Sequence, residues 1–134
     1  MLRFLTSRFV AATALLVAAT FAAFAQSLPV PSYWLNQRGS EMKLYSIDAQ
    51  GNFIGVYINH AQGFGCQGTP FPLSGRATGA NVTFKVVWQN AWQNCHSTTI
   101  WGGLVNGRLL PTEWVLAAPP SPPRFGKDLF TQQP

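Results

Sequence analysis

Residues 86–103 combine three tryptophans, Trp88, Trp92 and Trp101, with a cysteine, a histidine and a run of small hydroxyl side chains. A packed core would use the aromatic rings without the hydroxyl groups, and a solvent-facing surface would do the reverse. Small-molecule pockets use both, because apolar walls enclose the ligand while a few convergent polar groups fix its orientation. The stretch therefore indicates the wall of a ligand cavity.

Short apolar or alternating runs, separated by turn signals, are expected to position these residues. The mature chain has no convincing 3.6-residue repeat of the kind that predicts a helix. The runs predict strands at residues 32–37, 40–47, 53–60, 71–77, 81–89, 96–104, 108–117 and 127–132. An Asn-Gly pair at 106–107 indicates a hairpin. Eight short strands at regular spacing predict an all-β sandwich or barrel, and eight strands closed into a barrel leave room for one small ligand.

Residue parity predicts which side chains share a face, because side chains alternate along a strand. The face that carries Trp88, Trp101 and Trp114 also carries seven polar side chains: Asn36, Ser40, Tyr57, Asn59, Ser97, Thr99 and Asp128. Charged residues on the opposite, outward face are Glu41, Lys43, Lys85, Glu113 and Lys127. Asp128 is thus the single acidic residue expected inside, and Asn36 is expected to reach it if the first and last strands are neighbours. Because buried polar groups need hydrogen-bond partners, this mixed face favours a ligand cavity over a packed core.

The first 25 residues are typical of a secretory signal peptide. Arg3 and Arg8 precede an apolar run, which ends in the cleavage-site pattern Ala23-Phe24-Ala25. The run at residues 9–25 is marginal for a membrane span, and no basic stop-transfer cluster follows it. We therefore expect residues 1–25 to be removed. Residues 26–134 would form one domain, secreted or periplasmic, with no membrane segment in the mature form.

Charge and composition exclude several functional classes. Without Arg3 and Arg8 the chain has seven basic and four acidic residues, a net charge of +3 without the basic stripe of a nucleic-acid-binding protein. His60 and His96 fall on outward faces, and no acid faces either one in the sequence. We therefore expect neither an enzyme nor a metal site, and no cofactor. An even number of cysteines in an exported protein favours a disulfide.

Five blocks, in order from about residue 33 to 131, resemble the avidin/streptavidin family. They are WLNQRGS at 34–40, GVYIN at 55–59, residues 88–101 with WQN and HSTTIW, TEWVL at 112–116, and GKDLFT at 126–131. The resemblance implies an eight-stranded antiparallel up-and-down β-barrel, for which streptavidin is a well-known example. It also implies that residues 26–134 are a biotin-binding domain, which holds biotin non-covalently inside the barrel.

The resemblance assigns a role to each residue of the mixed face. Asn36, Ser40 and Tyr57 would donate hydrogen bonds to the ureido oxygen of biotin. Asn59 and Asp128 would accept from the two ureido N–H groups, although Asn59 replaces the small hydroxyl residue of the best-known members. The other implied contacts are Thr99 with the thioether sulfur, Ser97 and the 61–65 loop near the valerate carboxylate, and Trp88, Trp101, Trp114 and Leu116 around the ring and chain.

Two departures from the tetrameric members of the family bear on assembly. Those members insert a tryptophan into a neighbouring subunit from the connection between strands seven and eight, and this connection has no tryptophan here. Cys66 and Cys95 instead resemble the dimeric, rhizavidin-like bacterial branch, which implies an intrachain Cys66–Cys95 disulfide and a homodimer. Two alternatives are a lipocalin-like secreted β-barrel carrying another small apolar ligand, and an avidin-like scaffold with a structural or adhesive role. A generic apolar carrier does not need three donors and two acceptors in one place.

Overall fold

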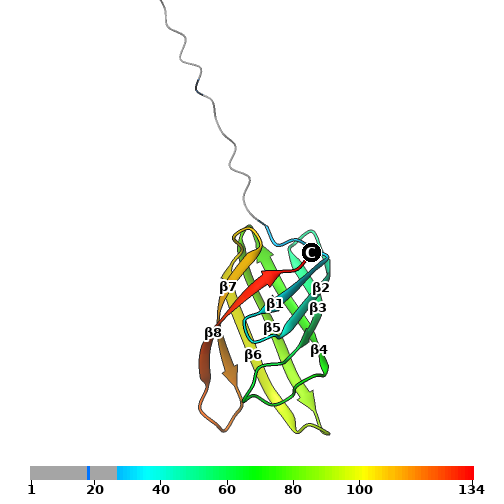
Figure 1. Ribbon diagram of the computed structural model, residues 1–134, viewed down its shortest axis with the longest axis vertical. Helices are drawn as coiled ribbons and strands as arrows, with labels where there is room; N and C mark the ends of the chain where they lie inside the picture. Colours follow the sequence, from blue (N-terminus) through cyan, green and yellow to red (C-terminus); the bar gives the residue numbers. More distant parts are fainter. Residues whose placement is uncertain (1–17, 19–26) are drawn as a thin grey trace, which may run out of the picture.

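The chain forms a closed barrel of eight antiparallel strands in sequence order (Figure 1). The computed structural model describes residue 18 and residues 27–134, so the expected signal peptide lies almost entirely outside the described residues. The strands are β1 (Ser32–Asn36), β2 (Glu41–Ile47), β3 (Asn52–Ile58), β4 (Pro70–Thr78), β5 (Asn81–Asn90), β6 (Cys95–Leu104), β7 (Leu109–Ala117) and β8 (Arg124–Gln132). The predicted barrel is confirmed. Among the described residues, no helix is long and apolar enough to cross a membrane.

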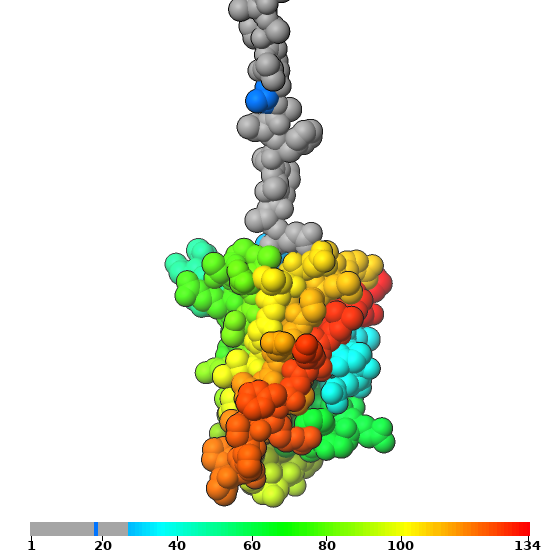
Figure 2. Space-filling model, turned by 90° about the vertical axis from the view of Figure 1, so that its left-hand side faces the viewer, coloured from blue at the N-terminus to red at the C-terminus, as the bar shows by residue number. Residues whose placement is uncertain are grey.

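The start of β8 differs from the prediction. The proline-rich segment after β7 led us to expect the last strand at residue 127, but β8 begins at Arg124. Arg124 pairs with Leu116 and Phe125 pairs with Val115, so the β7–β8 ladder begins directly after the last proline of this segment. Parity then places Arg124 on the same face as Asp128, at the end of the barrel where the β7–β8 connection projects (Figure 2, orange).

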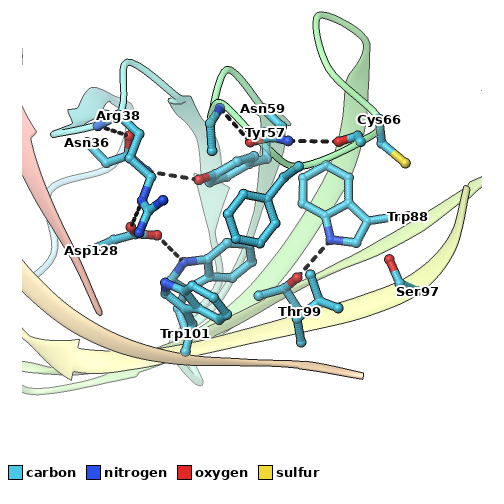
Figure 3. A pocket seen from close by; sticks show the side chains of 15 residues that line it. Asn36, Arg38, Tyr57, Asn59, Cys66, Trp88, Ser97, Thr99, Trp101 and Asp128 are labelled. Carbon is cyan, nitrogen blue, oxygen red and sulfur yellow. Dashed lines mark hydrogen bonds and ion pairs between the residues drawn. The ribbon is translucent and has the colours of Figure 1, made fainter. Parts of the chain in front are cut away.

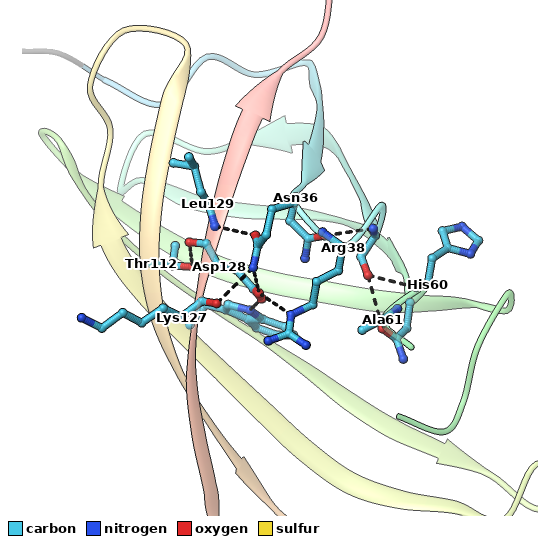
Figure 4. Close-up of polar contacts among 12 residues, drawn as sticks. Asn36, Arg38, His60, Ala61, Thr112, Lys127, Asp128 and Leu129 are labelled. Atoms are coloured by element: carbon cyan, nitrogen blue, oxygen red, sulfur yellow. Dashed lines mark hydrogen bonds and ion pairs between the residues drawn. The ribbon is translucent and has the colours of Figure 1, made fainter. Parts of the chain in front are cut away.

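The barrel closes where β1 pairs with β8. The backbone register between these strands covers only three pairs, ending at Asn36 and Phe130. The side chain of Gln37 continues the seam, because its Oε1 accepts from the backbone N–H of Leu129 at 2.8 Å and its Nε2 donates to the carbonyl of Lys127 at 3.2 Å (Figure 4). An amide side chain can replace a backbone unit in this way because it carries the same donor and acceptor groups.

The two ends of the barrel have different contents. The β2–β3, β4–β5 and β6–β7 turns lie at one end, which we call the packed end. The Asn-Gly pair at 106–107 predicted a hairpin, and the β6–β7 hairpin lies there. Its two turn residues are Gly107, at a φ of +61°, and Arg108. Large apolar side chains fill this end, and the fully buried ones include Trp34, Phe53, Phe84, Leu110 and Phe130. The opposite end, which we call the pocket end, carries the β1–β2, β3–β4, β5–β6 and β7–β8 connections and a cavity.

Candidate ligand-binding site

A cavity of about 100 Å³ opens at the pocket end of the barrel (Figure 3). Ten of the eleven residues predicted to bind a ligand line this cavity: Asn36, Tyr57, Asn59, Trp88, Ser97, Thr99, Trp101, Trp114, Leu116 and Asp128. Nine of them come from six strands, β1, β3, β5, β6, β7 and β8, and Asn59 directly follows β3. Strand alternation therefore gathers residues from across the sequence around one space.

Ser40 is the predicted residue that does not line the cavity. It is fully buried on the turn that leads into β2. Its hydroxyl accepts from the backbone N–H of His60 at 2.9 Å and donates to Oδ1 of Asn59 at 3.3 Å. In this structure Ser40 therefore joins the β1–β2 turn to the end of β3.

Asn36 and Tyr57 form a pair of polar groups at the inner end of the cavity. The Asn36 amide donates to the Tyr57 hydroxyl at 3.2 Å, and its Oδ1 accepts from the backbone N–H groups of Arg38 and Ser40, each at 2.9 Å. Burial raises the pKa of Tyr57, and the nearby charge of Asp128 raises it further. Tyr57 is thus a neutral hydroxyl at physiological pH, which can donate its proton to a ligand acceptor.

Asp128 is buried inside the barrel, as parity predicted, but its partners differ from the expected one. Oδ2 accepts from the indole N–H of Trp101 at 2.9 Å, and Oδ1 accepts from the Gln37 amide at 3.0 Å. The Arg38 guanidinium lies 3.4 Å from Oδ1 (Figures 3 and 4). The expectation that Asn36 would satisfy this acid was wrong, because Asn36 is already used by its own turn and by Tyr57.

The aromatic walls are held in fixed orientations by one another. Trp101 stacks on Phe84, with ring centroids 4.9 Å apart and an angle of 11° between the planes. The indole N–H of Trp88 donates to Oγ1 of Thr99 at 2.9 Å, which leaves the hydroxyl proton of Thr99 free to point elsewhere. Trp92, which drew attention in the sequence, is 74% exposed on the β5–β6 turn and belongs to no wall.

Asn59 lines the cavity, but protein groups use most of its hydrogen-bonding capacity. Its Oδ1 accepts from the Ala61 backbone N–H at 3.0 Å and from the Ser40 hydroxyl at 3.3 Å. Its Nδ2 donates to the Gly65 carbonyl at 2.9 Å (Figure 3). An amide oxygen has two lone pairs, and here both are directed at protein donors. Asn59 therefore ties the loop after β3 to the barrel.

The disulfide Cys66–Cys95 is present, as predicted, and joins the β3–β4 loop to the first residue of β6. Gln67 holds the same loop from within, because its amide donates to the carbonyls of Ala61 and Phe64, each at 2.8 Å. Cys66 and Phe64 also line the cavity. A covalent bond and several hydrogen bonds thus fix the loop that borders the cavity.

Sequence reasoning missed two arginines that lie beside Phe64, a residue of the cavity wall: Arg38 and Arg124. Arg38 lines the cavity and shares the parity of Asn36 and Ser40, a signal that we passed over because it lies in a turn. Arg124 was missed because the last strand was expected to begin later. Both guanidinium groups lie over the ring of Phe64, at 5.6 Å for Arg38 and 4.2 Å for Arg124.

Outside the barrel, the sequence-based statement that no acid faces a histidine was wrong for His60. Its Nε2 lies 3.0 Å from Oε2 of Glu41, because β2 and β3 are neighbours. Tyr33 donates to the other oxygen of Glu41 at 2.9 Å, and the hydrogen bonds from His60 and Tyr33 lower the pKa of this acid. Within the described part of the chain, no three metal-binding side chains come together.

Barrel and cavity together define a small-ligand-binding β-barrel. The family model for avidin matches residues 24–133, and the chain belongs to the avidin family. Afifavidin from Afifella pfennigii is 43% identical over 110 residues, which cover 76% of this chain and 68% of afifavidin. This membership sets aside the lipocalin-like alternative.

Solved structures agree with the assignment. Apo shwanavidin is 38% identical with a TM-score of 0.74, and the match covers 81% of this chain and all of that one. A bradavidin2–biotin complex is 38% identical with a TM-score of 0.71, covering 79% and 99% of the two chains. Rhizavidin is 42% identical with a TM-score of 0.70, covering 77% and 81%. The chain is therefore similar to rhizavidin, after which the predicted rhizavidin-like branch is named.

Proposed function

We propose that this protein binds biotin non-covalently inside the barrel and has no catalytic step. The observation that carries the proposal is the meeting of Asn36, Tyr57 and the Asp128 carboxylate in one cavity walled by indole rings. An apolar ligand alone would leave these buried polar groups unpaired, which costs free energy. The bradavidin2–biotin complex supports biotin as the ligand.

The ureido group and the bicyclic ring of biotin have chemistry that fits the groups around the cavity. The ureido oxygen is an acceptor, and the Asn36 amide and the Tyr57 hydroxyl can supply donors, with Ser40 directly behind them. The ureido N–H groups are donors, and the carboxylate of Asp128 retains acceptor capacity after its protein contacts. The three indoles would enclose the bicyclic ring, since each aromatic side chain offers about 150–250 Å² of surface for burial.

The remaining predicted contacts are part of the proposal. The Thr99 hydroxyl would reach the thioether sulfur, Leu116 would pack along the aliphatic chain, and Ser97 would lie near the valerate carboxylate. Asn59 would act on the ligand mainly through the loop it holds, because its oxygen already accepts two hydrogen bonds. The site therefore contains both groups that touch the ligand and groups that position others.

A thermal and calorimetric titration of the mature protein tests the biotin proposal. Biotin should bind one per chain and raise the melting temperature, because a ligand that binds only the folded state stabilises it. Tryptophan emission should also change, because three indoles line the cavity. A long-chain fatty acid, which is apolar and lacks a ureido group, should do neither. An unchanged melting curve at millimolar biotin would exclude the proposal.

We also propose that residues 1–25 direct export and are removed, so that residues 26–134 act outside the cytoplasm. The patterns of Arg3, Arg8 and Ala23-Phe24-Ala25 support this proposal. Mass spectrometry of the exported protein would locate the cleavage site.

A homodimer is proposed as the working form. This proposal is supported by a β7–β8 connection without tryptophan and by the pocket mouth that this chain builds from its own Phe64.

A further inference from the structure

The mouth of the cavity carries an aromatic ring flanked by two cations. Phe64 lines the cavity and meets the Trp114 ring edge to face, with centroids 5.9 Å apart. The Arg124 guanidinium lies 4.2 Å from the centre of the Phe64 ring, and the Arg38 guanidinium lies 5.6 Å from it. A ligand tail that leaves the cavity here would pass close to both positive charges.

The two arginines differ in how their charges are used. Arg38 faces the buried carboxylate of Asp128 at 3.4 Å, so much of its charge is neutralised locally. In residues 27–134, Arg124 makes no ion pair, and its guanidinium group lies over the ring of Phe64. Stacking on an aromatic ring fixes the position of a guanidinium group while leaving its charge uncompensated.

No free acid opposes Arg124 at the pocket end. The chain has four acidic residues, and Asp128 is the one inside the barrel. Asp48 lies in the β2–β3 turn at the packed end, while Glu113 pairs with Lys127 on the outer face at 3.7 Å. Glu41 is held by His60 and Tyr33 on the outside. The mouth of the cavity therefore has a positive electrostatic potential.

We propose that Arg124 determines specificity at this mouth and favours ligands whose exposed tail is an anion. The inference rests on the proposed function, in which the ligand is biotin. The valerate carboxylate of free biotin is ionised at neutral pH, whereas biotin joined through an amide has lost this charge. The pocket thus prefers free biotin to its uncharged amides, and the attraction is modest because the guanidinium is exposed and screened by salt.

The test compares free biotin with biotinamide, the primary amide of the same molecule, in four proteins: wild type, Arg124→Gln, Arg124→Lys and Lys127→Gln. The measured quantity is the ratio of the dissociation constants for amide and acid. Arg124→Gln should lower this ratio about three- to fivefold at low ionic strength, and by less at roughly 0.5 M salt. Arg124→Lys keeps the charge and should retain most of the preference.

Lys127→Gln is the matched control, because it removes one positive charge from the same strand at a side chain that is 81% exposed on the outer face. It should leave the ratio unchanged. An equal ratio in wild type and Arg124→Gln would overturn the inference. If the ratio is equal because Arg124→Gln weakens the binding of both ligands by the same factor, then Arg124 only positions Phe64. Binding of neither ligand to the wild type would instead show that the proposed function is wrong, and the inference would fall with it.

Discussion

The indole N–H of Trp101 donates a 2.9 Å hydrogen bond to Oδ2 of Asp128, so one ring forms a cavity wall and orients the buried carboxylate. The Gln37 amide and the Arg38 guanidinium hold the other oxygen, at 3.0 and 3.4 Å. The carboxylate is thus fixed before any ligand arrives. Such preorganisation lowers the entropy cost of binding, because fewer side chains have to be immobilised.

Asp128→Ala should weaken biotin binding by about 2 kcal/mol or more, roughly thirtyfold, because a charged acceptor makes a stronger hydrogen bond than a neutral one. Glu113→Ala, which removes an acid from the outer face, should hardly change the affinity. Calorimetry gives both values, and melting curves confirm that the barrel remains folded. Equal effects of the two substitutions would refute the assignment of Asp128 to the site.

Asn59→Ala should speed the dissociation of biotin, because the loop that borders the cavity loses its contacts with Ala61 and Gly65. The free energy of unfolding should fall by about 1–2 kcal/mol, as expected for lost hydrogen bonds of a buried side chain. Asn52→Ala serves as the control, since Asn52 hydrogen-bonds Asp48 at the packed end. Stopped-flow displacement with the same dissociation rate for both variants would contradict this role of Asn59.

Replacing both cysteines, Cys66→Ser with Cys95→Ser, should lower the free energy of unfolding by roughly 3–4 kcal/mol in the chain-entropy model for a loop of about 30 residues. It should also speed biotin dissociation, because Cys66 belongs to the cavity wall. Thiol labelling of the unreduced native protein should find no free thiol. A double variant with wild-type stability and dissociation rate would mean that the disulfide has no part in ordering the loop.

Stability should depend on pH through Glu41, whose pKa is lowered by hydrogen bonds from His60 and Tyr33. A depressed pKa means that the unfolded chain binds this proton more tightly, so the stabilisation is present above the ordinary glutamate pKa of about 4.3 and is lost as the pH falls through the folded-state value. Glu41→Gln should therefore lower the melting temperature at neutral pH and have little effect at strongly acidic pH.

Glu113→Gln provides the control for this pH dependence, since its partner Lys127 is exposed and such pairs contribute little to stability. Glu113→Gln should change the melting temperature only slightly, and by a similar amount at every pH. If Glu41→Gln shifts the melting temperature by the same amount at neutral and acidic pH, then the ionised carboxylate is not the source of the stabilisation.

The mature protein should be a dimer at micromolar concentration, because the β7–β8 connection carries no tryptophan to complete a neighbouring pocket. Light scattering should give a mass near that of two mature chains, with or without biotin. A mass near four chains would contradict the proposal.

The amino-acid sequence alone placed the cavity wall, because alternation along a strand is a local property of an extended chain. Parity put Trp88, Trp101 and Asp128 on inward faces without knowledge of which strands are neighbours. The turn signals separated eight strands whose ends agree with the structure within two residues, except that β8 begins three residues earlier than predicted.

The partners of those residues were decided by tertiary structure. Gln37 and Arg38, rather than Asn36, reach Asp128 because the β1–β2 turn folds against β8 where the barrel closes. Glu41 meets His60 because the register between β2 and β3 brings their ends together. A sequence pattern fixes the face on which a side chain lies, but the pairing of distant strands determines which atoms lie within hydrogen-bonding distance.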